Sequence, residues 1–138
     1  MFRILVVDDE PDLRHLLRRI FERAGHEVAD AGDGAVALAS ACASPPDLVV
    51  TDMMMPVMSG AELIMRLRAD PATAHIPILA ATGDAQLAAG ADAVLTKPYR
   101  PKELLAAGHD LLARACLARH GDALPRAWRD PTAGVARL

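Results

Sequence analysis

Ile4-Leu5-Val6-Val7-Asp8-Asp9 sets the pattern of this chain: four aliphatic residues followed at once by two acids. A short continuous run of this kind is typical of a β-strand that is covered on both faces. Leu48-Val49-Val50-Thr51-Asp52 repeats the pattern and again ends on an acid. Similar apolar runs at 77–81 and 94–96, with a weaker alternation at 26–31, bring the predicted strands to five.

Helical patterns separate these strands. Apolar residues of 13–24 fall on one face of a helix, and 35–43 is a run of small residues. Ser59 and Glu62 have the spacing of a capping box, and Pro101 stands at a first helical position. Strands that alternate with helices predict an α/β fold, in which right-handed crossovers build a parallel sheet with helices on both faces.

Length and composition fit one globular domain and exclude several classes of protein. The chain has 138 residues, of which 52% are hydrophobic and 24% charged. A net charge of −3 and only four aromatic residues argue against nucleic acid as a partner. No apolar run is long enough for a membrane span or a signal peptide, so we predict no membrane partner and a cytoplasmic location.

The periodic pattern ends near Arg119. We therefore predict one domain at 1–119 and a flexible tail at 120–138, which includes Trp128. Cys42 and Cys116 have no ligand-like spacing, and we expect both to be small core residues of a reduced, intracellular protein.

Polar residues follow the predicted strands at their carboxyl ends. Asp8 and Asp9 end the first strand, and Asp52 ends the third; Thr82 ends the fourth and Lys97 the fifth. In a parallel sheet these side chains converge on the crevice where such folds bind ligands. Three carboxylates this close resist ionisation unless a cation neutralises them, and an all-oxygen site suits Mg²⁺. With a lysine and a hydroxyl beside them, they predict phosphoryl transfer to a carboxylate oxygen.

Each residue taken alone has a simpler interpretation. Asp9 or Asp12 could cap the first helix, and Asp52 could begin a turn. Thr82 could be an ordinary strand-terminal residue, and Lys97 could be solvated. Their shared placement at carboxyl ends favours the functional interpretation. A cis peptide bond before Pro98 would aim the lysine inward.

The sequence resembles the receiver domains of two-component response regulators. The matching segments are 4–11, 46–60, 78–83 and 90–99, and the resemblance covers roughly residues 2–117. It implies a doubly wound five-stranded parallel sheet in the order 2-1-3-4-5, the flavodoxin-like arrangement.

The same resemblance implies a phosphorylation site. Asp52 would accept a phosphoryl group from a phosphohistidine on a sensor histidine kinase or histidine phosphotransfer protein. Asp8, Asp9, Asp52 and the backbone carbonyl of Met54 would hold Mg²⁺. Lys97 would pair with Asp52, and Thr82 would turn inward to the new phosphoryl oxygen.

The resemblance further implies a single-domain response regulator that relays its signal by protein–protein interaction. It would not be an enzyme, since it would catalyse only its own phosphorylation and dephosphorylation, whose rate Met54 and Asp84 would influence. A helical phosphodonor would dock on the outer face of the first helix, at Arg14, His15 and Arg18. The sequence leaves the oligomeric state open.

Two departures from the family concern the output side. Thr82 and Lys97 are only 15 positions apart, about seven residues fewer than a full helix between them requires. We therefore expect a truncated fourth helix. Val94 stands where the family commonly has an aromatic ring that moves on phosphorylation, and a β-branched residue is too stiff and small for that role. Both features predict an atypical output face.

Two other functions remain open. The first is a Mg²⁺-dependent hydrolase with an aspartyl-phosphate intermediate, although enzymes resembling the haloacid-dehalogenase group have a second aspartate where this chain has Met54. The second is an interaction module that is never phosphorylated.

Overall fold

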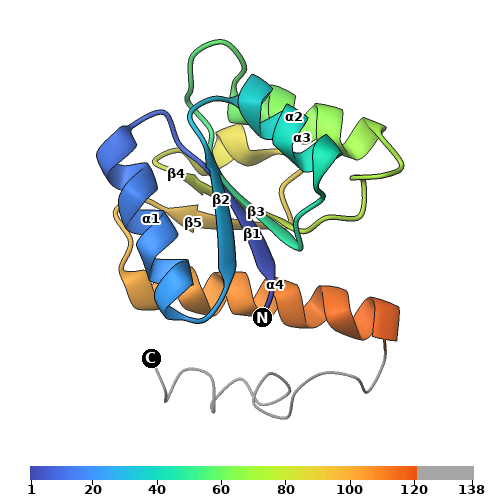
Figure 1. Cartoon of the computed structure of the whole chain (residues 1–138). Coiled ribbons are helices and arrows are strands. Elements are labelled where there is room, and N and C mark those ends of the chain that lie inside the picture. Colours follow the sequence, from blue (N-terminus) through green and yellow to red (C-terminus); the bar gives the residue numbers. More distant parts are fainter. Residues whose placement is uncertain (121–138) are drawn as a thin grey trace.

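Five strands alternate with helices in the computed structural model, which describes residues 1–120 and the side chains as far as residue 118 (Figure 1). The predicted tail, with Trp128, lies outside the described residues, except for His120, with which the last helix ends. The elements are, in chain order, β1 (Arg3–Val7), α1 (Pro11–Arg23), β2 (Glu27–Ala31), α2 (Gly34–Ala43), β3 (Leu48–Asp52), α3 (Gly60–Ala69), β4 (Ile78–Thr82), the 3₁₀ helix η1 (Ala85–Ala88), β5 (Ala93–Thr96) and α4 (Pro101–His120).

The strands form one parallel sheet in the order β2-β1-β3-β4-β5, which confirms the predicted topology. The central strands are buried along almost their whole length. Their continuous aliphatic runs follow from this, because both faces are covered. All five carboxyl ends lie at the same edge of the sheet.

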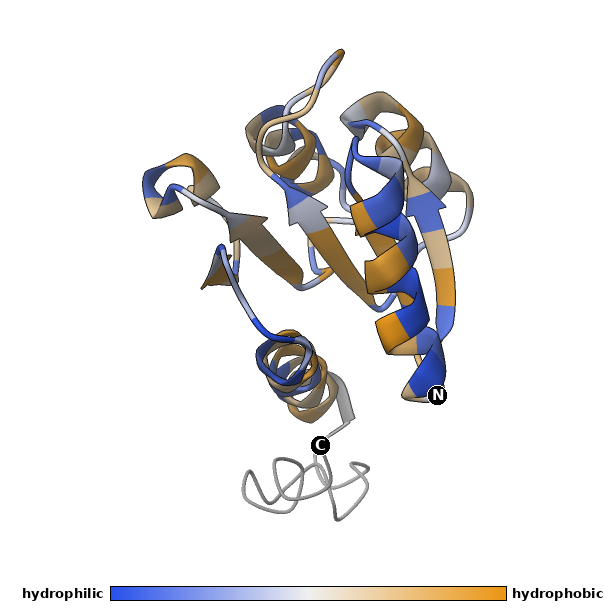
Figure 2. Ribbon diagram, turned by 90° about the vertical axis from the view of Figure 1, so that its left-hand side faces the viewer, coloured by the Kyte–Doolittle hydropathy of each residue, from blue (hydrophilic) through white to orange (hydrophobic). Residues whose placement is uncertain are grey.

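Two apolar layers cover the sheet. α1 and α4 lie on one face and α2 and α3 on the other (Figure 1). Alternate residues of each strand point to opposite layers. Leu5 and Val7 of β1 belong to the cluster under α2 and α3, and Ile4 and Val6 belong to the cluster under α1 and α4. Figure 2 shows the central strands mostly in hydrophobic colours, while α1 carries a hydrophobic stripe beside hydrophilic residues.

The segment between β4 and β5 is as short as the sequence predicts. Its helical part is η1, four residues long, too short to cover β5. On the η1 side of the sheet β5 is consequently open, and Val94 is 40% exposed. Asp92, at the end of this segment, accepts from the guanidinium of Arg68 on α3. The same guanidinium donates to the backbone oxygens of Ala74 and Ile76 in the loop before β4.

Helix starts follow the predicted chemistry in part. The Ser59 hydroxyl caps α3 by accepting from the backbone N–H of Glu62 at 3.2 Å. The Glu62 carboxylate pairs with Arg66. Neither Asp9 nor Asp12 caps α1: the capping position is Glu10, with no hydrogen bond from its side chain to the helix.

Neither cysteine belongs to the core clusters, so the prediction that both are core residues was wrong. Cys42 is exposed, and Cys116 is half-buried; both are free thiols. α2 consists almost entirely of small apolar residues, so its sequence has no polar face to indicate which side turns outward. Among residues 1–120, no helix is both long and apolar enough to cross a membrane.

Candidate phosphoacceptor site

Three aspartates meet at the carboxyl edge of the sheet. Asp8 and Asp9 follow β1, and Asp52 is the last residue of β3, which pairs with β1. Each offers a carboxylate oxygen, and these oxygens lie within 4.8 Å of one another. Asp8 is 2% exposed, while Asp9 is exposed to solvent. The predicted acidic cluster is therefore present; it is buried at Asp8 and open to solvent at Asp9.

Backbone contacts hold Asp8 in place. Its Oδ1 accepts the N–H of Glu10 at 2.9 Å, and its backbone carbonyl accepts from the Arg14 guanidinium, also at 2.9 Å. Burial raises the pKa of Asp8, and the charges of Asp52 and Asp9 raise it further against the opposing effects of the Glu10 N–H and of Lys97. A cation close to this carboxyl group would oppose the rise in its pKa.

Lys97 supplies one positive charge to the cluster. Its Nζ lies 3.4 Å from Oδ1 of Asp52, and the same oxygen accepts the N–H of Met53 at 2.8 Å. The peptide bond between Lys97 and Pro98 is cis. One monocation among three acids leaves the cluster with a net negative charge.

Thr82 lies on the next strand, buried, beside the acids. Its Oγ1 accepts the N–H of Asp84 at 3.2 Å, so its own hydroxyl hydrogen can donate to another oxygen. Nothing lies within 4 Å of the position that a Cβ on Gly83 would take. The end of β4 therefore offers a donor next to open space.

The loop from β3 to α3 and the first residue of α3 pack tightly against the site. A Cβ on Gly60 would lie 2.3 Å from the backbone oxygen of Asp52, so only glycine fits there. Val57 in the same loop has a φ of 69°, a strained conformation for a β-branched residue.

The residues present fit a divalent cation. The candidate ligands are all hard oxygen atoms, one of them on a buried acid whose ionisation a cation would favour. The backbone carbonyl of Met54, two residues after Asp52 in the loop, is the fourth predicted ligand; the Met54 side chain is exposed.

The chain matches a known family over most of its length. The family described as response regulator receiver domain matches residues 4–109. The chain belongs to this family. Receiver domains act in two-component signalling, and the coarse functional prediction from the sequence is thereby confirmed.

Curated relatives contain receiver segments of similar sequence. The DNA-binding dual master transcriptional regulator RpaA of Synechocystis is 40% identical over 121 residues, which cover 83% of this chain and 50% of RpaA. The sensor histidine kinase TmoS of Ectopseudomonas mendocina is 38% identical over 143 residues, covering 99% of this chain and 14% of TmoS. The chain thus spans half or less of these two proteins.

Solved receiver structures share the fold over nearly their whole length. Chemotaxis protein CheY4 of Vibrio cholerae has a TM-score of 0.75 at 34% identity, covering 80% of this chain and 98% of CheY4. The receiver domain of a sensor histidine kinase from Pseudomonas aeruginosa, described with a magnesium ion coordinated in its active site cleft, has a TM-score of 0.76 at 27% identity, covering 80% and 97%.

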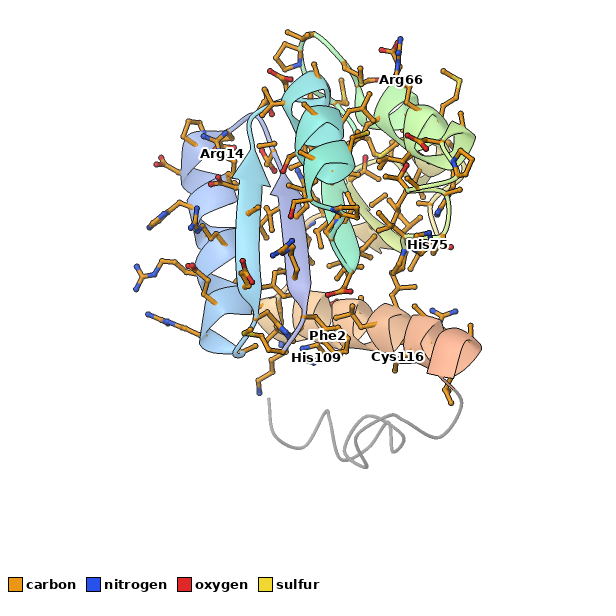
Figure 3. The ribbon with its side chains drawn as sticks, turned by 45° about the vertical axis from the view of Figure 1, so that its right-hand side comes forward. Phe2, Arg14, Arg66, His75, His109 and Cys116 are labelled. Carbon is orange, nitrogen blue, oxygen red and sulfur yellow. The ribbon has the colours of Figure 1, made fainter. Side chains whose placement is uncertain are left out.

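Some features of this receiver's site did not follow from sequence patterns. Arg14 and Arg18, predicted as docking residues, make ion pairs with Asp30 at 3.7 and 3.6 Å. Figure 3 shows Arg14 on α1, close to the carboxyl end of β2. The Tyr99 hydroxyl is buried near the acids. In the sequence, the only indication that Tyr99 lies near the site is its position two residues after Lys97.

Proposed function

We propose that this receiver domain accepts a phosphoryl group on Asp52 from a phosphohistidine of a partner protein, in a Mg²⁺-dependent reaction. The observation that carries the proposal is the cluster of Asp8, Asp9 and Asp52 with Lys97 Nζ 3.4 Å from Asp52. Receiver domains take phosphoryl groups from histidine kinases, so a sensor kinase or a histidine phosphotransfer protein is the proposed donor.

The reaction is a transfer between two protein side chains. A carboxylate oxygen of Asp52 forms a bond to phosphorus as the bond from phosphorus to the donor imidazole nitrogen breaks, and that nitrogen keeps the bonding electron pair. Bound Mg²⁺, held by Asp8, Asp9, Asp52 and the Met54 carbonyl, would neutralise negative charge on the acids and on the phosphoryl oxygens.

The chain's own residues prepare this transfer. Oδ1 of Asp52 is held by the Met53 N–H and lies next to Lys97, which fixes the direction of the carboxylate. Lys97 then offsets charge on a phosphoryl oxygen, and the Thr82 hydroxyl donates to another. We assign no external substrate: the proposed chemistry is limited to phosphorylation of Asp52 and hydrolysis of the resulting acyl phosphate.

Labelling tests the proposal. Radiolabelled acetyl phosphate is expected to label the wild-type protein with Mg²⁺ and not with excess EDTA, and Asp52→Asn should remain unlabelled. Asp12→Asn is the matched control, because Asp12 is an exposed acid of α1 outside the cluster. Metal-independent labelling, or equal labelling of Asp52→Asn, would contradict the proposal. Steady turnover of a small phosphomonoester would instead support the hydrolase.

The output of the signal is proposed to be atypical. The exposed Val94 cannot act as a buried aromatic switch, and η1 has only four residues. Phosphorylation would therefore act through the loop around Asp84, whose N–H bonds the Thr82 hydroxyl. Amide exchange with and without beryllofluoride should differ mainly at residues 83–90; a change confined to α4 would contradict this.

A further inference from the structure

The Tyr99 hydroxyl is the one buried side-chain polar atom, among the residues that the structure describes, for which no hydrogen-bond partner is present. Buried tyrosine hydroxyls normally have a partner, because an unpaired polar group away from bulk water is costly. The rest of the ring is accounted for: it packs against the apolar cluster under α1 and α4. The hydroxyl therefore needs a separate explanation.

The position of the ring places the hydroxyl beneath the acids. Val6 and Val50 belong to the cluster against which Tyr99 packs. Side chains two residues apart on a strand share a face, so Asp8 and Asp52 continue the rows of Val6 and Val50 on that face. Tyr99 thus extends from the loop after β5 toward the buried side of the acidic cluster.

The pKa of Tyr99 agrees with this placement near the acids. Burial, followed by the charges of Asp8 and Asp52, raises the pKa of Tyr99 to about 12. The phenol, like any tyrosine near neutral pH, is protonated and can donate a hydrogen bond. Asp8 is the more buried acceptor, whereas Oδ1 of Asp52 already has Met53 and Lys97 beside it.

We propose that Tyr99 is a positioning residue of the phosphoacceptor site, whose hydroxyl donates through a bridging water to the Asp8 carboxylate. The hydrogen bond would hold the Asp8 carboxylate in one orientation, directed at the cation. The effect on Mg²⁺ binding rests on the proposed function. The hydrogen bond itself does not require the metal.

Calorimetric titration with Mg²⁺ tests the consequence. Removing a partner that orients a metal ligand typically weakens metal affinity about tenfold, and this is the loss expected for Tyr99→Phe. Leu105→Val is the matched control, since Leu105 packs against the same cluster without a polar atom, and its affinity should equal that of the wild type. An unchanged affinity in Tyr99→Phe overturns the inference.

Raman spectroscopy tests the hydrogen bond directly, without metal. Tyr99 is the only tyrosine of the chain, so the tyrosine Fermi doublet reports on this hydroxyl alone. The intensity ratio should indicate a donor in the wild type and change in Asp8→Ala, which removes the acceptor, while Asp12→Ala leaves it unchanged. A ratio that Asp8→Ala does not move overturns the inference. A wild type that binds no Mg²⁺ overturns the proposed function, and the Raman comparison still decides on Tyr99.

Discussion

Acidification from about pH 7 to about pH 5 is expected to destabilise the fold through two histidines at the amino ends of the strands. His26, 8% exposed, accepts the N–H of Phe2 on Nδ1, and its Nε2 lies 2.9 Å from Nε2 of His109 on α4. Figure 3 shows Phe2 and His109 close to each other beside α4. Two ring nitrogens at hydrogen-bond distance can share one proton, so charging both rings disrupts the contact.

The magnitude follows from the shift of one group. Burial, with smaller effects of the charges on His109 and the N-terminus, lowers the pKa of His26 from 6.5 to about 4. Between these values the unfolded chain binds more protons than the folded protein, so stability falls as the pH falls. Over the stated pH interval His26 alone accounts for about 2 kcal/mol of lost unfolding free energy. Burial also lowers the pKa of His109, with the same sign.

Urea denaturation followed by circular dichroism, in steps of pH, measures the effect. His26→Asn is the comparison, because its side chain can still accept from Phe2 and does not titrate. The raised pKa of Asp8 acts in the opposite direction, adding stability as the pH falls, but it is common to both proteins and cancels in the difference. Parallel loss of stability in wild type and variant would refute the reasoning.

Three further predictions concern Val57 and Gly60 near the site and the contacts of Arg68 at the amino ends of β4 and β5. Val57→Gly should raise the unfolding free energy by about 1 kcal/mol in urea denaturation, because it relieves a positive φ at a side chain that is 82% exposed; a loss of stability would contradict the strain. Gly60→Ala should abolish acetyl phosphate labelling, because the new methyl group would displace the backbone of Asp52; normal labelling would show that the loop adapts. Arg68→Ala should cost about 2 kcal/mol in thermal unfolding, because it loses hydrogen bonds to Ala74, Ile76 and Asp92. Arg66→Ala, which loses one exposed ion pair, should cost less than about 1 kcal/mol; equal losses would contradict a stabilising role of the Arg68 contacts.

The sheet and the acidic cluster could be predicted because both follow from local patterns. The apolar runs of β1 and β3 indicate strands buried on both faces, and the residue after each run must lie at the carboxyl edge. The truncated segment before β5 could be predicted from a count of residues between Thr82 and Lys97. No long-range contact had to be known in these cases.

The remaining features depend on contacts between residues distant in sequence. His26 and His109 are 83 positions apart, and neither position shows a pattern that pairs them. The burial of the Tyr99 hydroxyl could not be predicted either, because it depends on how the loop after β5 packs in the three-dimensional structure. The orientation of α2 could not be predicted, because Val36 and Ala37 are both apolar and only tertiary packing exposes the first and buries the second.

The open edge formed by β5 bears on self-association. β5 pairs with β4 on one side only, and its free backbone groups could template a strand from another molecule. With four residues between Asp92 and Lys97, this strand is too short and too closely flanked by charge for extended pairing. Although no helix covers it, the β5 edge is therefore a poor template for edge-to-edge aggregation.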